Sequence, residues 1–251
     1  MKDIDKNPFV LDETDDFAVV YKPSRMHSAP LPKGGGDTLL DWYAAQFPQV
    51  CDLSGRKGGE GGLLHRLDFE TQGLALFAKN QPSLDFLLTQ QNEGNFIKEY
   101  SAICQRSAAA IVSFPPPPVT VEMAGCAGDY VIESFFRPFG PGRKQVRPVT
   151  DDSKSRNEIA KDRGGYYRTE IVNVIDNIAD NGRCFFTVRL KRGFRHQIRC
   201  HLAWIGCPVV NDPLYGEQPD DGLLALRSHA LFFPDPASGK QREYRIEPLC
   251  F

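Results

Sequence analysis

Short runs of apolar, aromatic and β-branched residues recur along the chain and predict strands. FAVVYK at 17–22 is stopped by Pro23, and CFFTVRLK at 184–191 follows the turn residues Asp-Asn-Gly at 180–182, which favour a hairpin. Runs with the same character give the complete set of expected strands. These are 17–22, 74–79, 97–104, 131–138, 169–175, 184–191, 224–233 and 243–248.

Three segments have helical spacing of their apolar residues: 38–47, 82–93 and 195–205. After the last of them, Gly206 fits a C-terminal cap and Pro208 prevents continuation of the helix. Many strands with few helices favour an α+β or mixed α/β fold with a largely antiparallel sheet. The spacing alone does not give the order of the strands.

Composition places the chain among ordinary globular proteins. Its 251 residues can bury a substantial core, and 41% apolar with 25% charged residues is a usual balance. The formal net charge of −2 means that any nucleic-acid site must be a local basic surface. Seven irregularly spaced Cys suit free thiols, and no apolar run approaches the roughly 20 residues of a membrane helix. We therefore expect a cytoplasmic protein that does not act at a membrane.

The segment HRLDFETQGLALFAK at 65–79 holds the first candidate for chemistry, Asp68. A loop Asp is most often a turn former or a helix cap. A buried carboxylate needs an opposite charge to stay ionised, and Arg66 lies two positions away. Glu70 could form an acid/base pair with Asp68, as glycosidases require. That pairing is disfavoured because residues two apart diverge in a loop.

The segment RLKRGFRHQIRCH at 189–201 contains five cations within eleven residues and no acid. It is either a solvated basic face or a surface that binds phosphates. Arg195 and Arg199 are four apart, so we expect them on one face of the predicted helix. A second basic patch is expected in a loop within 137–156. Its members are Arg143, Lys144 and Arg147.

A metal site is the competing interpretation of the same segment. His196 and Cys200 are four apart, and His201 and Cys207 lie nearby. There is no CxxC or HExxH spacing, and the adjacent cations would oppose a divalent ion. We therefore expect no metal.

Tyr100 lies in a predicted strand two residues after Lys98. A strand Tyr is commonly a core aromatic, but it can also be a stacking platform for an unstacked base. GxSxG, P-loop and GxGxxG patterns are absent from the sequence, so serine hydrolases, NTPases and dinucleotide enzymes have no support.

Taken together, these segments resemble the RluA-type pseudouridine synthase family. HRLDFETQGLALFAK is close to the family's HRLDxxTSGLLLFAK, and KEYSA at 98–102 is like KxYxA. HQIRCHLAWIGCPVVNDPLYG is like HQIRxHLxxxGxPIxGDxxYG, and FAVVYKPSRMHSAP is a looser match to LxVxxKPxGxxxHP. The sequence departs from the family at three places: Gln72 replaces a Ser, Asn211 replaces a Gly, and Arg195 is displaced by one position.

The resemblance implies the pseudouridine synthase catalytic fold, a bent and largely antiparallel sheet flanked by helices. We expect residues 1–251 to form one catalytic domain, with two sub-lobes around a central cleft and no separate N-terminal RNA-binding module. The implied reaction breaks the N1–C1′ bond of a uridine in RNA and forms a C5–C1′ bond. It is redox-neutral and needs no cofactor.

The resemblance also implies roles for individual residues. Asp68 would be the essential carboxylate, either a nucleophile or the group that drives the sugar chemistry. Tyr100 would stack on the flipped uracil, Arg199 would pair with Asp68, and Arg66 would occupy the space that the base leaves. Further RNA contacts are expected from the remaining members of the motifs. They are His65, Thr71, Lys98, Arg192, Arg195 and His196.

Three alternatives remain open at this stage: a non-catalytic RNA-binding protein of the same fold, a glycosidase or nucleoside hydrolase, and a metal-dependent enzyme. The second would need another well-placed carboxylate, for which Glu70 and Asp212 are poor candidates. Ribosomal and transfer RNA are both possible partners, and a monomer is the default expectation.

Overall fold

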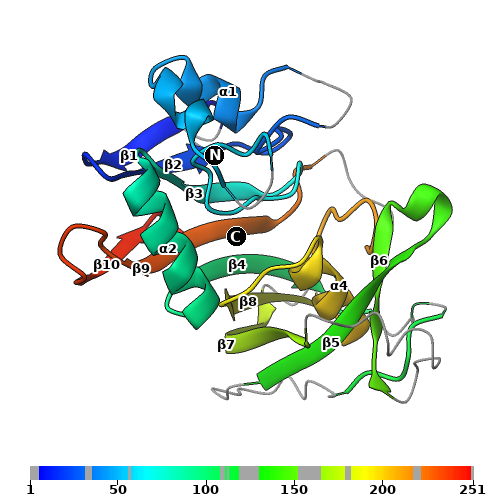
Figure 1. Cartoon of the computed structure of the whole chain (residues 1–251). Helices are drawn as coiled ribbons and strands as arrows, with labels where there is room; N and C mark the ends of the chain where they lie inside the picture. Colours follow the sequence, from blue (N-terminus) through cyan, green and yellow to red (C-terminus); the bar gives the residue numbers. More distant parts are fainter. Residues whose placement is uncertain are drawn as a thin grey trace. The chain divides into compact units, whose positions relative to one another are not determined.

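The computed structural model describes residues 6–31, 36–55, 58–107, 111, 113–118, 130–151, 165–178, 182–216 and 222–249 (Figure 1). The chain divides into two compact units. The first consists of Met1–Glu99 and Arg227–Pro248, and the second of Tyr100–Leu226 and Leu249–Phe251. None of the described helices combines the length and apolar character that crossing a bilayer requires.

The sheet of the first unit is built from strands that are far apart in sequence. Neighbouring strands are antiparallel in the pairs β1–β2, β2–β3 and β9–β10. Strands β3 and β9 run parallel, with Gln72 opposite Arg227 and Gly73 opposite Ser228. The strands are β1 (Phe9–Glu13), β2 (Phe17–Lys22), β3 (Gln72–Ala78), β9 (Leu226–Pro234) and β10 (Gln241–Arg245).

Helices cover both faces of the central strands β2 and β3, which explains why FAVVYK and QGLALFA are apolar without alternation. Alternate residues enter two different cores. One core packs against α2 (Gln81–Glu93) and the other against α1 (Leu39–Ala44), as Figure 1 shows. The first contains Phe17, Val19, Leu74, Leu76, Leu84 and Leu87, and the second contains Ala18, Val20, Ala75, Phe77, Leu39 and Leu40.

The ends of these helices follow from side-chain and backbone capping. Thr38 and Asp41 form a capping box at the start of α1. Asn80 accepts a hydrogen bond from Ser83 N at the start of α2, and Gly94 ends that helix in the left-handed conformation with φ +81°. A short 3-10 helix, η2 (Pro48–Asp52), follows α1.

The second unit has an antiparallel succession of strands in the order β8-β7-β5-β6. Helix α4 packs on β5 and β6 through a core that includes Phe136, Val146, Cys200 and Ala203. Strand β4 begins in the first unit and continues in the second. The elements are β4 (Ile97–Gln105), β5 (Tyr130–Phe139), η3 (Pro141–Arg143), β6 (Gln145–Val149), β7 (Tyr167–Ile178), β8 (Arg183–Leu190) and α4 (Gln197–Trp204).

The predicted α+β class with a mixed, largely antiparallel sheet is confirmed, and so is the antiparallel pairing of β7 with β8. Two of the three turn residues expected between those strands, 180 and 181, lie outside the described residues. Strands β1 and β6 were not predicted. The expected loop at 137–156 is wrong over most of its described length, because this segment contains the end of β5, the turn η3 and all of β6. Positions 152–156 lie outside the described residues.

The close approach of β3 to β9 requires a glycine at position 73. Gly73 has φ +121°, and a Cβ built there would lie 2.2 Å from Ser228 O. We expect Gly73→Ala to lower the free energy of unfolding by about 3 kcal/mol or more, because backbone cannot yield to an added methyl. Gly239→Ala is the matched control: its φ is +68° and nothing lies within 4 Å. Its expected loss, measured by urea denaturation, is about 1 kcal/mol. Equal losses would contradict the steric account.

Candidate active site

Asp68 lies in the segment that leads into β3, and its backbone forms a tight turn. Thr71 N donates to Asp68 O at 3.1 Å. Asp68 and Glu70 are half-buried, whereas Phe69 between them is 39% exposed. The carboxylate of Asp68 therefore sits on a short, closed turn beside a buried strand.

Side chains that follow β2 hold this turn by its backbone. Ser28 Oγ donates to Leu67 O at 2.9 Å and accepts from Leu67 N at 3.0 Å. Ser24 Oγ donates to Glu70 O at 2.7 Å. Two hydroxyls thus fix the residues on each side of Asp68. Such support from the scaffold keeps a reactive group in one place.

Lys22, the last residue of β2, also holds the backbone of this turn. Its side chain is fully buried, and Nζ donates to Pro23 O at 2.9 Å, Met26 O at 2.7 Å and Phe69 O at 3.4 Å. Burial lowers the pKa of Lys22 to about 7, and the carboxylates of Asp68 and Glu70 oppose that shift. The bond to Phe69 O ties Lys22 to the backbone of the residue that follows Asp68.

Among the described residues, no hydrogen-bond partner is found for certain buried atoms of two polar side chains on this segment. They are both ring nitrogens of His65 and Oγ1 of Thr71. The His65 ring meets the edge of Phe96 with centroids 5.3 Å apart. Burial, together with the charge of Lys98, lowers the pKa of His65 to about 3. His65 is therefore neutral at physiological pH and retains unused capacity for a donor and an acceptor.

Three other predicted residues differ in their exposure. Arg66 is exposed, and its Nη1 lies 3.3 Å from Glu60 Oε1. Lys98 is only 3% exposed, with Nζ 4.7 Å from the centroid of the Phe96 ring. Tyr100 on β4 is 6% exposed and begins the second unit. Their predicted contacts with RNA remain predictions.

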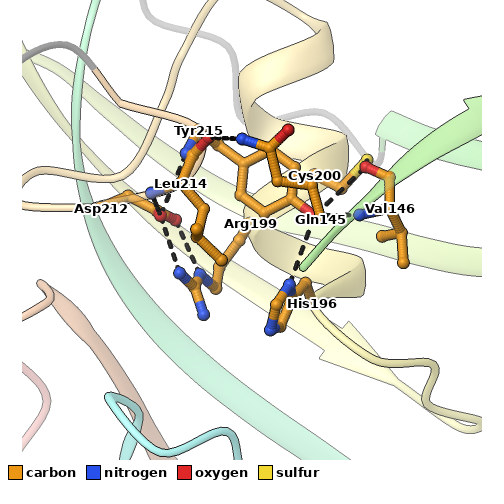
Figure 2. A network of polar contacts seen from close by, with 8 residues as sticks. All are labelled: Gln145, Val146, His196, Arg199, Cys200, Asp212, Leu214 and Tyr215. Carbon is orange, nitrogen blue, oxygen red and sulfur yellow. Dashed lines mark hydrogen bonds and ion pairs between the residues drawn. The ribbon is translucent and has the colours of Figure 1, made fainter. Parts of the chain in front are cut away.

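Arg199 on α4 forms a fully buried, bidentate ion pair with Asp212 (Figure 2). Nε lies 2.7 Å from Oδ2 and Nη2 lies 2.8 Å from Oδ1, and both side chains are 0% exposed. Oδ1 also accepts from Leu214 N at 2.9 Å and Tyr215 N at 3.2 Å. These bonds offset the cost of burying two charges. Asp68 belongs to the first unit and Arg199 to the second, so their predicted pairing remains a prediction.

The basic segment does not form one continuous helix face. Arg195 and His196 precede α4, and His196 has φ +55°, so Arg195 does not share a helix face with Arg199 as expected. Arg195 is exposed and donates from Nη2 to Arg143 O and Gln145 O at 2.9 and 3.0 Å.

The other expected RNA contacts of this segment have partners of their own. Arg192 Cζ lies 4.6 Å from the centroid of the Tyr167 ring, and its Nη2 donates to that hydroxyl at 3.2 Å. His196 Nδ1 lies 3.3 Å from Tyr215 Oη.

The residues considered as metal ligands are engaged in structural hydrogen bonds. His201 contacts Thr169 Oγ1 at 2.8 Å and Ser134 Oγ at 2.9 Å, and burial lowers its pKa to about 3. Cys200 Sγ donates to Val146 O at 3.4 Å. Within the described ranges, no group of three or more His, Cys, Asp or Glu could hold a metal ion.

The family described as RNA pseudouridylate synthase matches residues 16–204, about three quarters of the chain. The chain belongs to the RNA pseudouridylate synthase family. This family is one of isomerases, and its matched region includes Asp68, Tyr100 and Arg199 but ends before Asp212 and Tyr215.

Similar proteins carry names that agree with this assignment. The uncharacterized RNA pseudouridine synthase YlyB of Bacillus subtilis is 28% identical over 96% of this chain, which spans 70% of that protein. Ribosomal large subunit pseudouridine synthase D of Haemophilus ducreyi is 26% identical over 84% of this chain and 53% of its own length. The human RNA pseudouridylate synthase domain containing 1 shares the fold, with a TM-score of 0.65, 18% identity, and coverage of 98% of this chain and 86% of that one.

Two departures from the pseudouridine synthase motifs have local explanations. Gln72 Oε1 accepts from Tyr21 Oη at 2.9 Å and Arg227 Nη2 at 3.2 Å, so the longer side chain is anchored inside the first unit. Asn211 has φ +60°, a conformation that favours glycine and that Asn tolerates better than other residues.

Sequence reasoning did not single out Lys22, Ser24 or Ser28 as parts of the site. A lysine directly before Pro23 at the end of an apolar strand was the available signal. It also treated Asp212 only as a poor second carboxylate, whereas this residue is the buried partner of Arg199. The position of Asp212 four residues after Pro208, which prevents continuation of the helix, gave no indication of that role.

The support of the Asp68 turn can be tested at Ser28. We expect Ser28→Ala to lower the free energy of unfolding by about 1–3 kcal/mol, because the buried Leu67 N and O both lose their bond to this hydroxyl. Thr89→Ala is the control, since Thr89 Oγ1 makes one exposed bond to Asp85 O. Equal free energies of unfolding of the two variants in urea would show that the two bonds from Ser28 to Leu67 do not stabilise the turn.

The buried pair predicts a large effect of charge removal at Asp212. Asp212→Asn should destabilise the protein by about 3–5 kcal/mol, because the fully buried guanidinium of Arg199 loses its facing carboxylate. Glu133→Gln removes the acid of an exposed pair with Arg168, and should cost about 1 kcal/mol or less. Unfolding of both variants in guanidinium chloride gives the two losses in free energy of unfolding for comparison. Similar losses would contradict the structural importance of the buried pair.

Proposed function

We propose that this protein isomerises a uridine in structured RNA to pseudouridine, with Asp68 as the essential carboxylate. The observation that carries the proposal is the turn that presents Asp68: its flanking backbone is held by Ser28, Ser24 and the buried Lys22. This turn lies within the region matched by the family. A carboxylate held on a rigid turn suits chemistry at a sugar carbon.

The reaction requires that the site accept a flipped base and exclude water. A stacked uridine must be flipped out, because its C1′ and C5 cannot be reached within a helix. Arg66, which is exposed, would enter the space left by the base, and Tyr100 would stack on the uracil. Water must be kept away while the base is detached, because hydrolysis would leave an abasic site.

The orphaned polar atoms of the Asp68 segment support a polar substrate at this position. His65 and Thr71 flank Asp68, and their buried nitrogen and hydroxyl groups lack partners. Buried polar groups normally have a hydrogen-bond partner. We infer that the ribose or uracil supplies it once RNA binding exposes these atoms, which are covered in the free protein.

Ribosomal or transfer RNA is the proposed substrate, and large-subunit ribosomal RNA is the first to test, because similar proteins carry that substrate in their names. The chain spans between 53 and 70% of the length of the two bacterial relatives described above. We further propose that the protein acts in the cytoplasm as a monomer. Its five described cysteines are free thiols, as a reducing compartment allows.

The test uses transcripts labelled with tritium at C5 of uridine, because forming the C5–C1′ bond releases that hydrogen to water. We expect Asp68→Asn to abolish tritium release while RNA affinity stays within about twofold, since one half-buried polar group replaces another of the same shape. Asp85→Asn, an exposed change on α2, should release tritium at the wild-type rate.

Three outcomes would contradict the proposal. Turnover by Asp68→Asn would remove Asp68 from its role. Free uracil as the wild-type product would point to a glycosidase instead. RNA binding without any release by the wild-type protein would favour a non-catalytic RNA-binding protein of the same fold.

A further inference from the structure

Strand β6 is the edge strand in the order β8-β7-β5-β6 of the second unit, and the side chain of Tyr215 is hydrogen-bonded to its outer edge. Tyr215 Oη accepts from Val146 N at 2.7 Å and lies 3.2 Å from Val146 O, to which it can donate. His196 Nδ1 approaches the same hydroxyl at 3.3 Å (Figure 2). One phenol therefore occupies both backbone groups of a single strand residue.

Further contacts fix β6 to the segment that carries Tyr215. Gln145 Nε2 donates to Leu214 O in that segment, and Cys200 Sγ separately ties β6 to α4 by donating to Val146 O at 3.4 Å. Tyr215 is itself held, because its backbone N donates to Asp212 Oδ1 at 3.2 Å. The buried pair of Arg199 and Asp212 thus anchors the residues that grip β6 (Figure 2).

The hairpin between β5 and β6 carries a cluster of positive charge at its tip. Arg143 and Lys144 are exposed, and the exposed Arg195 crosses to Arg143 O and Gln145 O with its Nη2. In the described part of the chain, none of these three cations pairs with a carboxylate. Three unneutralised cations around one turn are unusual on a chain of net charge −2, and they suit an anionic ligand with repeated charges.

We propose that the tip of the β5–β6 hairpin, with Arg143, Lys144 and Arg195, binds phosphates of the RNA substrate, and that Tyr215 is the positioning residue that holds this tip in place. The inference rests on the proposed function for the identity of the RNA, but its binding step is independent of catalysis. RNA phosphates are favoured over an acidic protein because the backbone of RNA repeats its negative charge at a regular spacing, which a cluster of exposed cations on one turn can match.

A double-mutant cycle on RNA binding tests the proposal. The probe is a fluorescein-labelled RNA stem-loop with uridines in its loop, titrated at several salt concentrations. Arg143→Ala with Lys144→Ala should weaken binding about 10-fold and reduce the salt slope by about 1–2, roughly one unit for each phosphate that the protein no longer neutralises. With Tyr215→Phe already present, the same two changes should weaken binding less than about threefold, because a loose tip no longer presents its charges.

Tyr43→Phe is the matched control. Tyr43 is a buried tyrosine of the first unit whose hydroxyl donates to Glu13 at 2.9 Å. In that background the loss from Arg143→Ala with Lys144→Ala should remain about 10-fold, because general destabilisation leaves the tip in place. Gln145→Met, which removes the bond to Leu214 O but keeps Tyr215, should repeat the coupling if Tyr215→Phe fails to fold.

Additive losses in both the Tyr215→Phe and Gln145→Met backgrounds would overturn the positioning role, and an unchanged salt slope for the tip variants would overturn the phosphate surface. Failure of the proposed function is separable from either result. Coupled binding by a protein that releases no tritium would leave this inference standing, whereas tritium release with additive binding losses would refute it and leave the proposed function standing.

Discussion

The bidentate pair between Arg199 and Asp212 is the constraint on which the second unit depends. Both side chains are fully removed from water, which costs several kcal/mol for each ion unless every bond is made. Asp212 makes four, two to the guanidinium and two to the backbone of residues 214 and 215. A group with so many fixed partners cannot shift by itself. Helix α4, the loop that carries Asp212 and Tyr215, and strand β6, to which Tyr215 is hydrogen-bonded, are therefore held in one arrangement.

The first unit solves a similar problem with backbone acceptors. Lys22 is buried among carbonyl groups, and two serine hydroxyls bind the turn on each side of Asp68. The result is a carboxylate on a turn that is rigid because its neighbours are satisfied, while His65 and Thr71 beside it retain unsatisfied atoms. A reactive group keeps one geometry when the residues around it are fixed, and the hydrogen bonds of Lys22, Ser24 and Ser28 fix the turn that carries Asp68.

The sequence allowed the central strands to be predicted because β2 and β3 are buried on both faces and read as unbroken apolar runs. Strand β6 was missed because QVRPV carries an Arg and a Pro and is held at one edge by Tyr215, a residue that lies 69 positions away. The family motifs marked Asp68 and Arg199 as candidate site residues, and their catalytic roles remain predictions. The burial of Lys22 had one local signal, its place at the end of an apolar strand before Pro23, but its backbone acceptors could not be predicted. The pairing of Arg199 with Asp212 left no local pattern, because the two residues are 13 positions apart and meet only in the folded chain.

The measurement that tests the central claim most directly is a pseudouridine map of total RNA, made by carbodiimide labelling and reverse transcription, from cells with and without this gene. The account predicts that one or a few uridines lose their stop in the deletion strain and regain it when the wild-type gene is returned. An identical map in both strains, together with no tritium release from transcripts by the purified protein, would contradict it.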